Sequence, residues 1–160
     1  MRVLLIPVAL AAVCVSSLAA QGPQAKPAPA AKAPALKWGP APDAFPAGAK
    51  MAVVSGDPSK SAMFSIELSM PDGYKIPPHF HPTDETVEVK SGTFQFAMGD
   101  TFDATQLKTM AVGGKGTIPA QMHHYAVAKG ATVVQVSAMG PFALTYVNPT
   151  DDPRQAKPKM

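Results

Sequence analysis

The stretch "GYKIPPHFHPTDETVEVKSG", Gly73–Gly92, holds two of the four histidines of the 160-residue chain, His79 and His81, one residue apart. On a β-strand, residues i and i+2 point to the same face, so these two imidazoles can converge on one point. The other two histidines, His123 and His124, are adjacent in sequence. All the imidazole of the protein is therefore concentrated in two places.

The same alternation predicts which carboxylate lies near the histidine pair. If the strand resumes after a bend at 82–83, Glu85 shares a face with Val87 and Val89, whereas Glu88 faces solvent. A buried glutamate is costly unless it is paired or binds a cation, and imidazole together with carboxylate suits a borderline divalent metal. The hypothesis is a metal site, and the alternative is a polar cluster without a metal.

Apolar residues with a period of two continue on both sides of this stretch. In "MFSIELSM", residues 63–70, every second side chain is apolar, which is typical of a strand with one buried face. "AVVS", "TVEV", "TFQFAM", "TVVQVSAM" and "ALTYV" are also strand-like and are separated by Gly, Pro, Asp and Asn. "DATQLKT" alone resembles a helical turn, with Asp103 as its cap. The predicted fold class is all-β, a sandwich or a jelly-roll barrel.

These histidines, the glutamate and the strand-like segments resemble those of the cupin superfamily. The first cupin motif is a glycine, five residues, His-x-His, three or four residues, a glutamate, six residues and a glycine. It is matched without exception by Gly73, His79, His81, Glu85 and Gly92. A His-x-His pair alone would be weak evidence, but the complete motif is specific.

The second cupin motif is matched in part. Gly113, Pro119 and His124 stand at its expected positions, but Gln121 replaces the usual glycine and Ala128 the usual asparagine. These departures concern the geometry of a turn and one hydrogen bond rather than the metal ligand. The resemblance covers the whole domain in strand order, and the chain looks like small exported bacterial single-domain cupins (RmlC-like) of unassigned activity.

The resemblance implies a double-stranded β-helix, the cupin jelly-roll barrel, with one divalent metal inside it. His79, His81, Glu85 and His124 would hold the metal, which could be Fe, Mn, Ni, Co, Cu or Zn. His123 competes with His124 as the fourth ligand, although strand parity places it on the opposite face. Its other roles would be a rim residue or a proton carrier near the bound substrate.

The N-terminal residues of the chain predict export. Residues 1–20 have the charged, apolar and small-residue regions of a Sec-type signal peptide, so we expect a periplasmic or secreted protein. Val13 is bulky for the position before a lipidated cysteine, which argues against a lipid anchor at Cys14, the only cysteine. Residues 21–36 form a Pro/Ala/Lys-rich linker, 37–150 the cupin domain and 151–160 a flexible tail. No later apolar run is long enough to span a membrane.

Charge excludes one class of partner. The chain carries 14 basic and 11 acidic residues, but half of the basic residues lie outside residues 38–150, which contain seven basic and nine acidic ones. A nucleic-acid-binding domain would show a basic face, so we expect no nucleic acid partner. The resemblance adds a homodimer as a reasonable expectation.

The expected function is that of a small metalloenzyme. A metal with open coordination positions could bind a small oxygen-rich or aromatic molecule, in an oxygenase or a lyase/isomerase reaction. The alternative is a metal-dependent module that binds or senses a small ligand without catalysis. The sequence leaves open the metal, the substrate, the oligomeric state and the choice between these two functions.

Overall fold

The structure is a computed structural model that describes residues 35–155. The predicted signal peptide, all but the last two residues of the predicted linker, and residues 156–160 lie outside this range. Within the range, no helix is long and apolar enough to cross a membrane.

The described residues form strands and two short 3-10 helices, as an all-β prediction requires. The strands are β1 (Gly39–Pro40), β2 (Lys50–Ser55), β3 (Met63–Met70), β4 (Lys75–Phe80), β5 (Glu85–Met98), β6 (Lys108–Ala111), β7 (Lys115–Ile118), β8 (His124–Met139) and β9 (Thr145–Tyr146). The helices are η1 (Ala104–Gln106) and η2 (Pro149–Asp151). The turn predicted at Asp103 is η1, and the Asp103 side chain accepts a hydrogen bond from the Thr105 backbone N–H.

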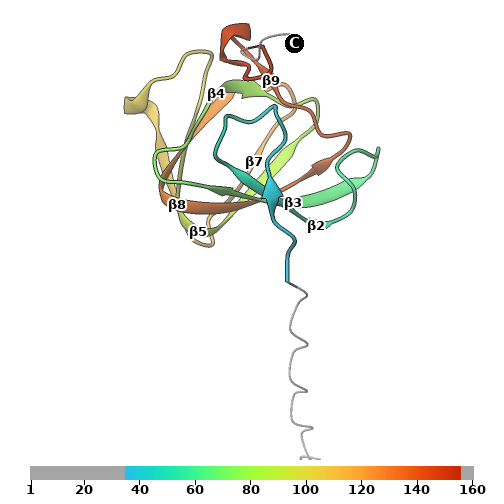
Figure 1. Cartoon of the computed structure of the whole chain (residues 1–160). Helices are drawn as coiled ribbons and strands as arrows, with labels where there is room; N and C mark the ends of the chain where they lie inside the picture. Colours follow the sequence, from blue (N-terminus) through green and yellow to red (C-terminus); the bar gives the residue numbers. More distant parts are fainter. Residues whose placement is uncertain (1–34, 156–160) are drawn as a thin grey trace, which may run out of the picture. The chain divides into compact units, whose positions relative to one another are not determined.

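All strand pairs are antiparallel, and β8 is the strand shared by the pairs with β3, β4 and β5 (Figure 1). Along one edge β8 pairs with β3 and β4, and along the other it pairs with β5 over most of its length. β5 in turn pairs with β6 and β7. The sheet curls on itself into a jelly-roll barrel, so the fold class predicted from the sequence is confirmed.

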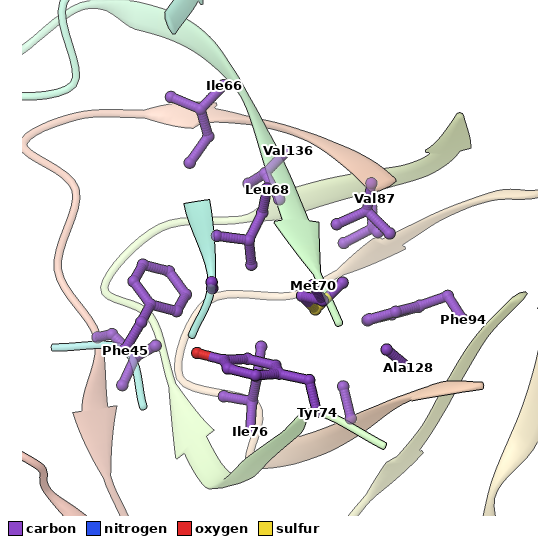
Figure 2. Close-up of a cluster of buried hydrophobic side chains, with 14 of the residues drawn as sticks. Phe45, Ile66, Leu68, Met70, Tyr74, Ile76, Val87, Phe94, Ala128 and Val136 are labelled. Atoms are coloured by element: carbon purple, nitrogen blue, oxygen red, sulfur yellow. The ribbon is translucent and has the colours of Figure 1, made fainter. Parts of the chain in front are cut away.

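The predicted alternation places the core inside this barrel. Phe64, Ile66, Leu68 and Met70 of β3 are each at most 2% exposed, while the residues between them are half-buried. Figure 2 shows apolar side chains from several strands directed into one cluster, with Phe45 and Phe94 at opposite sides of the view. Phe45 comes from the segment between β1 and β2, so a loop helps to fill the interior.

The parity predicted around Glu85 is also confirmed. Glu85, Val87 and Val89 of β5 are buried, whereas Glu88 lies on the solvent face and its carboxylate is 2.9 Å from Lys90 Nζ. Because the chain continues through Gly92, two predicted strands are one long strand, β5. The first half of β5 therefore carries Glu85 into the barrel, toward the histidines.

At the C-terminal end, Arg154 contacts the segment between β8 and β9. The Arg154 guanidinium donates a hydrogen bond to the Leu144 carbonyl and pairs with Asp152, 2.7 Å away. Asn148 caps η2 through its side-chain oxygen.

Candidate metal centre

Three strands bring the four predicted ligands to one place inside the barrel. His79 lies in β4 and pairs directly with His124, the first residue of β8. His81 follows the end of β4, and Glu85 is the first residue of β5. All four residues are at least 94% buried. They meet because strand ends that are far apart in sequence converge at one end of the barrel.

The donor atoms of the three histidines lie close to one another, and the Glu85 carboxylate lies beside two of them. One ring nitrogen from each of His79, His81 and His124 lies within 4.8 Å of the others. Glu85 Oε2 is 3.4 Å from the Nε2 atoms of both His81 and His124. Two ligand atoms bound about 2.1 Å from one metal, at angles of about 90–110°, are themselves about 3.0–3.4 Å apart. The carboxylate contacts match that spacing.

Backbone carbonyls fix which nitrogen of each imidazole faces the cluster. The Nδ1–H groups of His79, His81 and His124 donate to the carbonyls of Pro77, Ala143 and Met122 at 2.7, 2.7 and 2.9 Å. A carbonyl can only accept, so Nδ1 carries a proton, and in the neutral form of such a ring the Nε2 lone pair is free. This arrangement is the usual one behind metal-binding histidines, where the carbonyl also orients the ring.

Burial keeps the His79 imidazole neutral. Burial, followed by the neighbouring His124 and His81, lowers the pKa of His79 to about 3. Burial alone would raise the pKa of Glu85, but contact with His124 and the nearby imidazoles outweighs it, so the pKa of Glu85 is lowered. At neutral pH the centre thus holds a carboxylate and a neutral His79. A buried carboxylate beside three clustered imidazoles is a donor set of nitrogen and oxygen atoms, and the residues therefore fit a divalent metal.

The cavity around this centre is otherwise apolar. Its described lining consists of the four candidate ligands and aliphatic or phenylalanine side chains, namely Phe45, Ile66, Leu68, Ile76, Val87, Phe94, Ile118, Ala126, Val134, Val136 and Phe142. The hydroxyls of Tyr74 and Tyr146 bond to backbone carbonyls of Pro46 and Ala44. The polar atoms in the cavity are therefore those of the candidate ligands.

Neither a protein-family model nor a curated protein matches the sequence. Solved structures do. A protein from Methylibium petroleiphilum, provisionally assigned as an acetylacetone dioxygenase, is 22% identical and superposes with a TM-score of 0.56, over 74% of this chain and 79% of that one. The polyketide cyclase RemF from Streptomyces resistomycificus gives 18% identity and a TM-score of 0.55, over 67% and 76%. An oxalate oxidase gives 17% identity and a TM-score of 0.51, over 67% and 59%.

The domain has the cupin fold. Within that fold, the structure brings His124 rather than His123 to the cluster with His79 and His81. His123 lies on the other face of β8's start, where its Nδ1 is 2.7 Å from Asp100 Oδ1 and its ring stacks on Phe80. It does not line the cavity of the candidate ligands.

The turn that precedes His124 has a left-handed residue, Gln121, at the position where the cupin motif usually has glycine. Gln121 has a φ of 62°, the left-handed conformation that glycine adopts easily, and no other non-glycine residue among 35–155 has a positive φ. Its backbone N–H donates to the His81 carbonyl at 2.9 Å. The turn is thereby held against the His81 backbone. Ala128, in place of the usual asparagine, is fully buried and leaves its position in the core apolar.

One contributor to the site had no sequence signal. The loop between β8 and β9 supplies the Ala143 carbonyl to His81, and Phe142 stacks on the His81 ring with centroids 5.2 Å apart. Phe142 also contacts Phe45 and Phe64. Two adjacent loop residues thus hold His81, Ala143 at the edge of its ring and Phe142 at the face.

Proposed function

We propose that this cupin is a metal-dependent enzyme that acts on a small molecule bound at His79, His81, Glu85 and His124. The observation that carries the proposal is the convergence of three Nε2 lone pairs and one carboxylate in a buried apolar cavity. When bound there, a divalent metal would supply a positive centre able to polarise a substrate oxygen or to take part in oxygen chemistry.

The chain's own residues have three tasks in this proposal. The three imidazoles and Glu85 hold the ion, and the carbonyl acceptors at Pro77, Met122 and Ala143 keep the imidazoles in the binding tautomer. The apolar wall excludes water, which strengthens electrostatic interactions inside the cavity.

The cavity favours an oxygenase over a lyase or isomerase. Reactions of the last two kinds need a positioned acid or base, and the described lining offers no lysine, aspartate, tyrosine or serine for that role. His123, the candidate proton carrier, faces Asp100 instead of the cavity. Structural neighbours named as an acetylacetone dioxygenase and an oxalate oxidase support a small oxygen-bearing substrate for this fold. We therefore propose dioxygen-dependent cleavage or oxidation of such a molecule.

A reconstitution experiment tests this proposal. Metal-stripped protein would be loaded separately with Fe²⁺, Mn²⁺, Co²⁺, Ni²⁺, Cu²⁺ and Zn²⁺, and oxygen consumption would be followed with a panel of β-dicarbonyl, α-hydroxy acid and catechol compounds. We expect turnover with at least one redox-active metal, its loss on adding chelator, and its loss in His81→Ala. His123→Ala is the matched control and should keep the activity. Turnover that is indifferent to chelator would contradict the proposal.

The same absence of other polar groups favours a second candidate, a module that binds a small ligand through the metal without changing it. Mass spectrometry of the bound ligand after long incubation in air separates the two. An unchanged ligand with every metal would support binding alone, whereas stoichiometric or greater conversion would support the enzyme.

We further propose that the protein acts outside the cytoplasm, as periplasmic or secreted protein. The support is the composition of residues 1–20. In a secreting host, the intact mass of the exported protein should correspond to cleavage after Ala19 or Ala20. Retention of the full-length mass in the cytoplasm would contradict this proposal.

A further inference from the structure

We infer that the ligand of this centre has two parts, a small chelating head and an unbranched or aromatic apolar tail that lies between β5, β6 and β7. The inference rests on the proposed function, because the head would bind at the metal. It is carried by a second apolar hollow that shares three lining residues with the metal-facing cavity.

The two hollows share a wall. Val87, Phe94 and Ile118 line both the cavity of the candidate ligands and the second hollow. Val87 and Phe94 lie on the same side of the core cluster in Figure 2, beside Ala128. If the head of a ligand lies at the histidines, its tail would therefore point toward these three side chains.

Beyond this wall, β5 forms an apolar line that leads outward. Phe94, Phe96 and Met98 point to one face, and their exposure rises from 6% at Phe94, through a half-buried Phe96, to 45% at Met98. Their partners across β8 are Ala128, Ala126 and His124, of which the two alanines are small. Phe94 lines both hollows, whereas Phe96 and Met98 line only the second one, so these side chains border the space of the second hollow.

Glycine at position 116 keeps that space open. Gly116 pairs with Val87 across β7 and β5, and a Cβ placed on it would lie 3.4 Å from the Met110 methyl carbon. Any larger side chain there would project into the hollow. Since its φ is not positive, the backbone does not require glycine, and room for a ligand is a reason for its presence.

The hollow offers nothing that would recognise a polar tail. Its described lining is Val87, Phe94, Phe96, Met98, Met110, Gly116, Thr117 and Ile118. The Thr117 hydroxyl is already bonded to the Thr86 hydroxyl at 3.0 Å. A sugar would leave its hydroxyls unpaired here, whereas an alkyl or aryl chain would gain by burial. The flexible thioethers of Met98 and Met110 can adjust to the width of such a chain.

A hydroxamate series tests the inference, since its members share one chelating head. The protein loaded with Co²⁺ would be titrated with acetohydroxamate and hexanohydroxamate, and binding read from the cobalt absorption spectrum. Burial of the added methylenes should make hexanohydroxamate bind at least about tenfold more tightly. In Gly116→Leu this ratio should fall toward one. Lys115→Leu places the same leucine side chain on the exposed neighbouring residue and should preserve the ratio.

A second measurement does not depend on a variant. With ¹³C-methyl methionine labelling, and Met110→Leu to assign the signal, the Met110 methyl resonance should shift with hexanohydroxamate and stay in place with acetohydroxamate. Equal affinities for the two hydroxamates, or an unmoved Met110 signal, would contradict the binding of an apolar tail in the second hollow but not the metal centre. No cobalt spectral change with either hydroxamate would overturn the metal centre and the tail together.

Discussion

Gly73 and Gly92, the two glycines of the first cupin motif, share a left-handed backbone but differ in their surroundings. Their φ angles are 71° and 75°. Open space surrounds the position of a Cβ at Gly73, whereas one at Gly92 would lie 2.3 Å from the Ala131 carbonyl oxygen and 2.6 Å from Thr132 Oγ1. Only Gly92 is therefore required for both conformation and space.

This difference predicts unequal effects of one substitution. Gly73→Ala should lower the free energy of unfolding by about 1–2 kcal/mol, the cost of the left-handed conformation. Gly92→Ala should cost at least about 3 kcal/mol, because backbone must also move. Urea denaturation of the two variants measures the difference, and equal losses would contradict it.

Residue identity predicted the candidate ligands but not the backbone groups that support them. His79, His81, Glu85 and His124 could be found because alternation and motif spacing depend on side-chain type. The carbonyls that hold the imidazoles could not, since every residue carries a carbonyl and only the folded chain shows which ones face a ring. The left-handed turn at Gln121 was hidden for a related reason, because glutamine rarely adopts that conformation.

At the scale of elements, the buried hydroxyl of Thr132 in β8 bonds to β5 where the pairing of the two strands is irregular. The register between them shifts around Ser91. There Thr132 Oγ1 accepts from the Thr93 N–H at 3.2 Å and lies within hydrogen-bonding distance of the Thr93 and Gly130 carbonyls, at 3.1 and 3.0 Å. Thr132 is 1% exposed, so these backbone groups have little access to water.

Thr132→Val should therefore destabilise the domain by about 1–3 kcal/mol, because it leaves buried backbone groups without their partner. Thr132→Ser should recover most of the loss. Thr117→Val, which removes an exposed hydroxyl pair, should change stability by less than about 0.5 kcal/mol. Thermal unfolding of the three variants provides the comparison, and a neutral Thr132→Val would show that the hydroxyl does not support the β5–β8 pairing.

Element types followed from the sequence more readily than element lengths. The alternation of apolar residues predicted β3 directly, but β5 and β8 each join two sequence segments that Gly92 and Gly130 separate. Both glycines have positive φ and the strands bend there without ending. The short strands β6 and β7 have no strong apolar period, so their sequences did not predict them. Pairing with β5 rather than their own composition holds them in the sheet.

At the scale of the whole molecule, the lowered pKa of His79 links folding to pH. His79 titrates near 3 when folded and near 6.5 when unfolded, so between these values the unfolded chain binds more protons. The metal-free protein should therefore lose on the order of 2–3 kcal/mol between pH 7 and pH 4 from this group. In His79→Gln the urea midpoint should depend less steeply on pH over this range. Equal pH dependence in both proteins would contradict the burial of a neutral His79.

The central claim, that the buried histidine cluster is a metal site, is tested most directly by metal content. Elemental mass spectrometry would be applied to protein purified without added metal, beside His124→Ala and His123→Ala. We predict about one metal ion per chain in the wild type and in His123→Ala, and loss of that metal in His124→Ala. No bound metal in the wild type, or the same trace amount in all three proteins, would contradict the account.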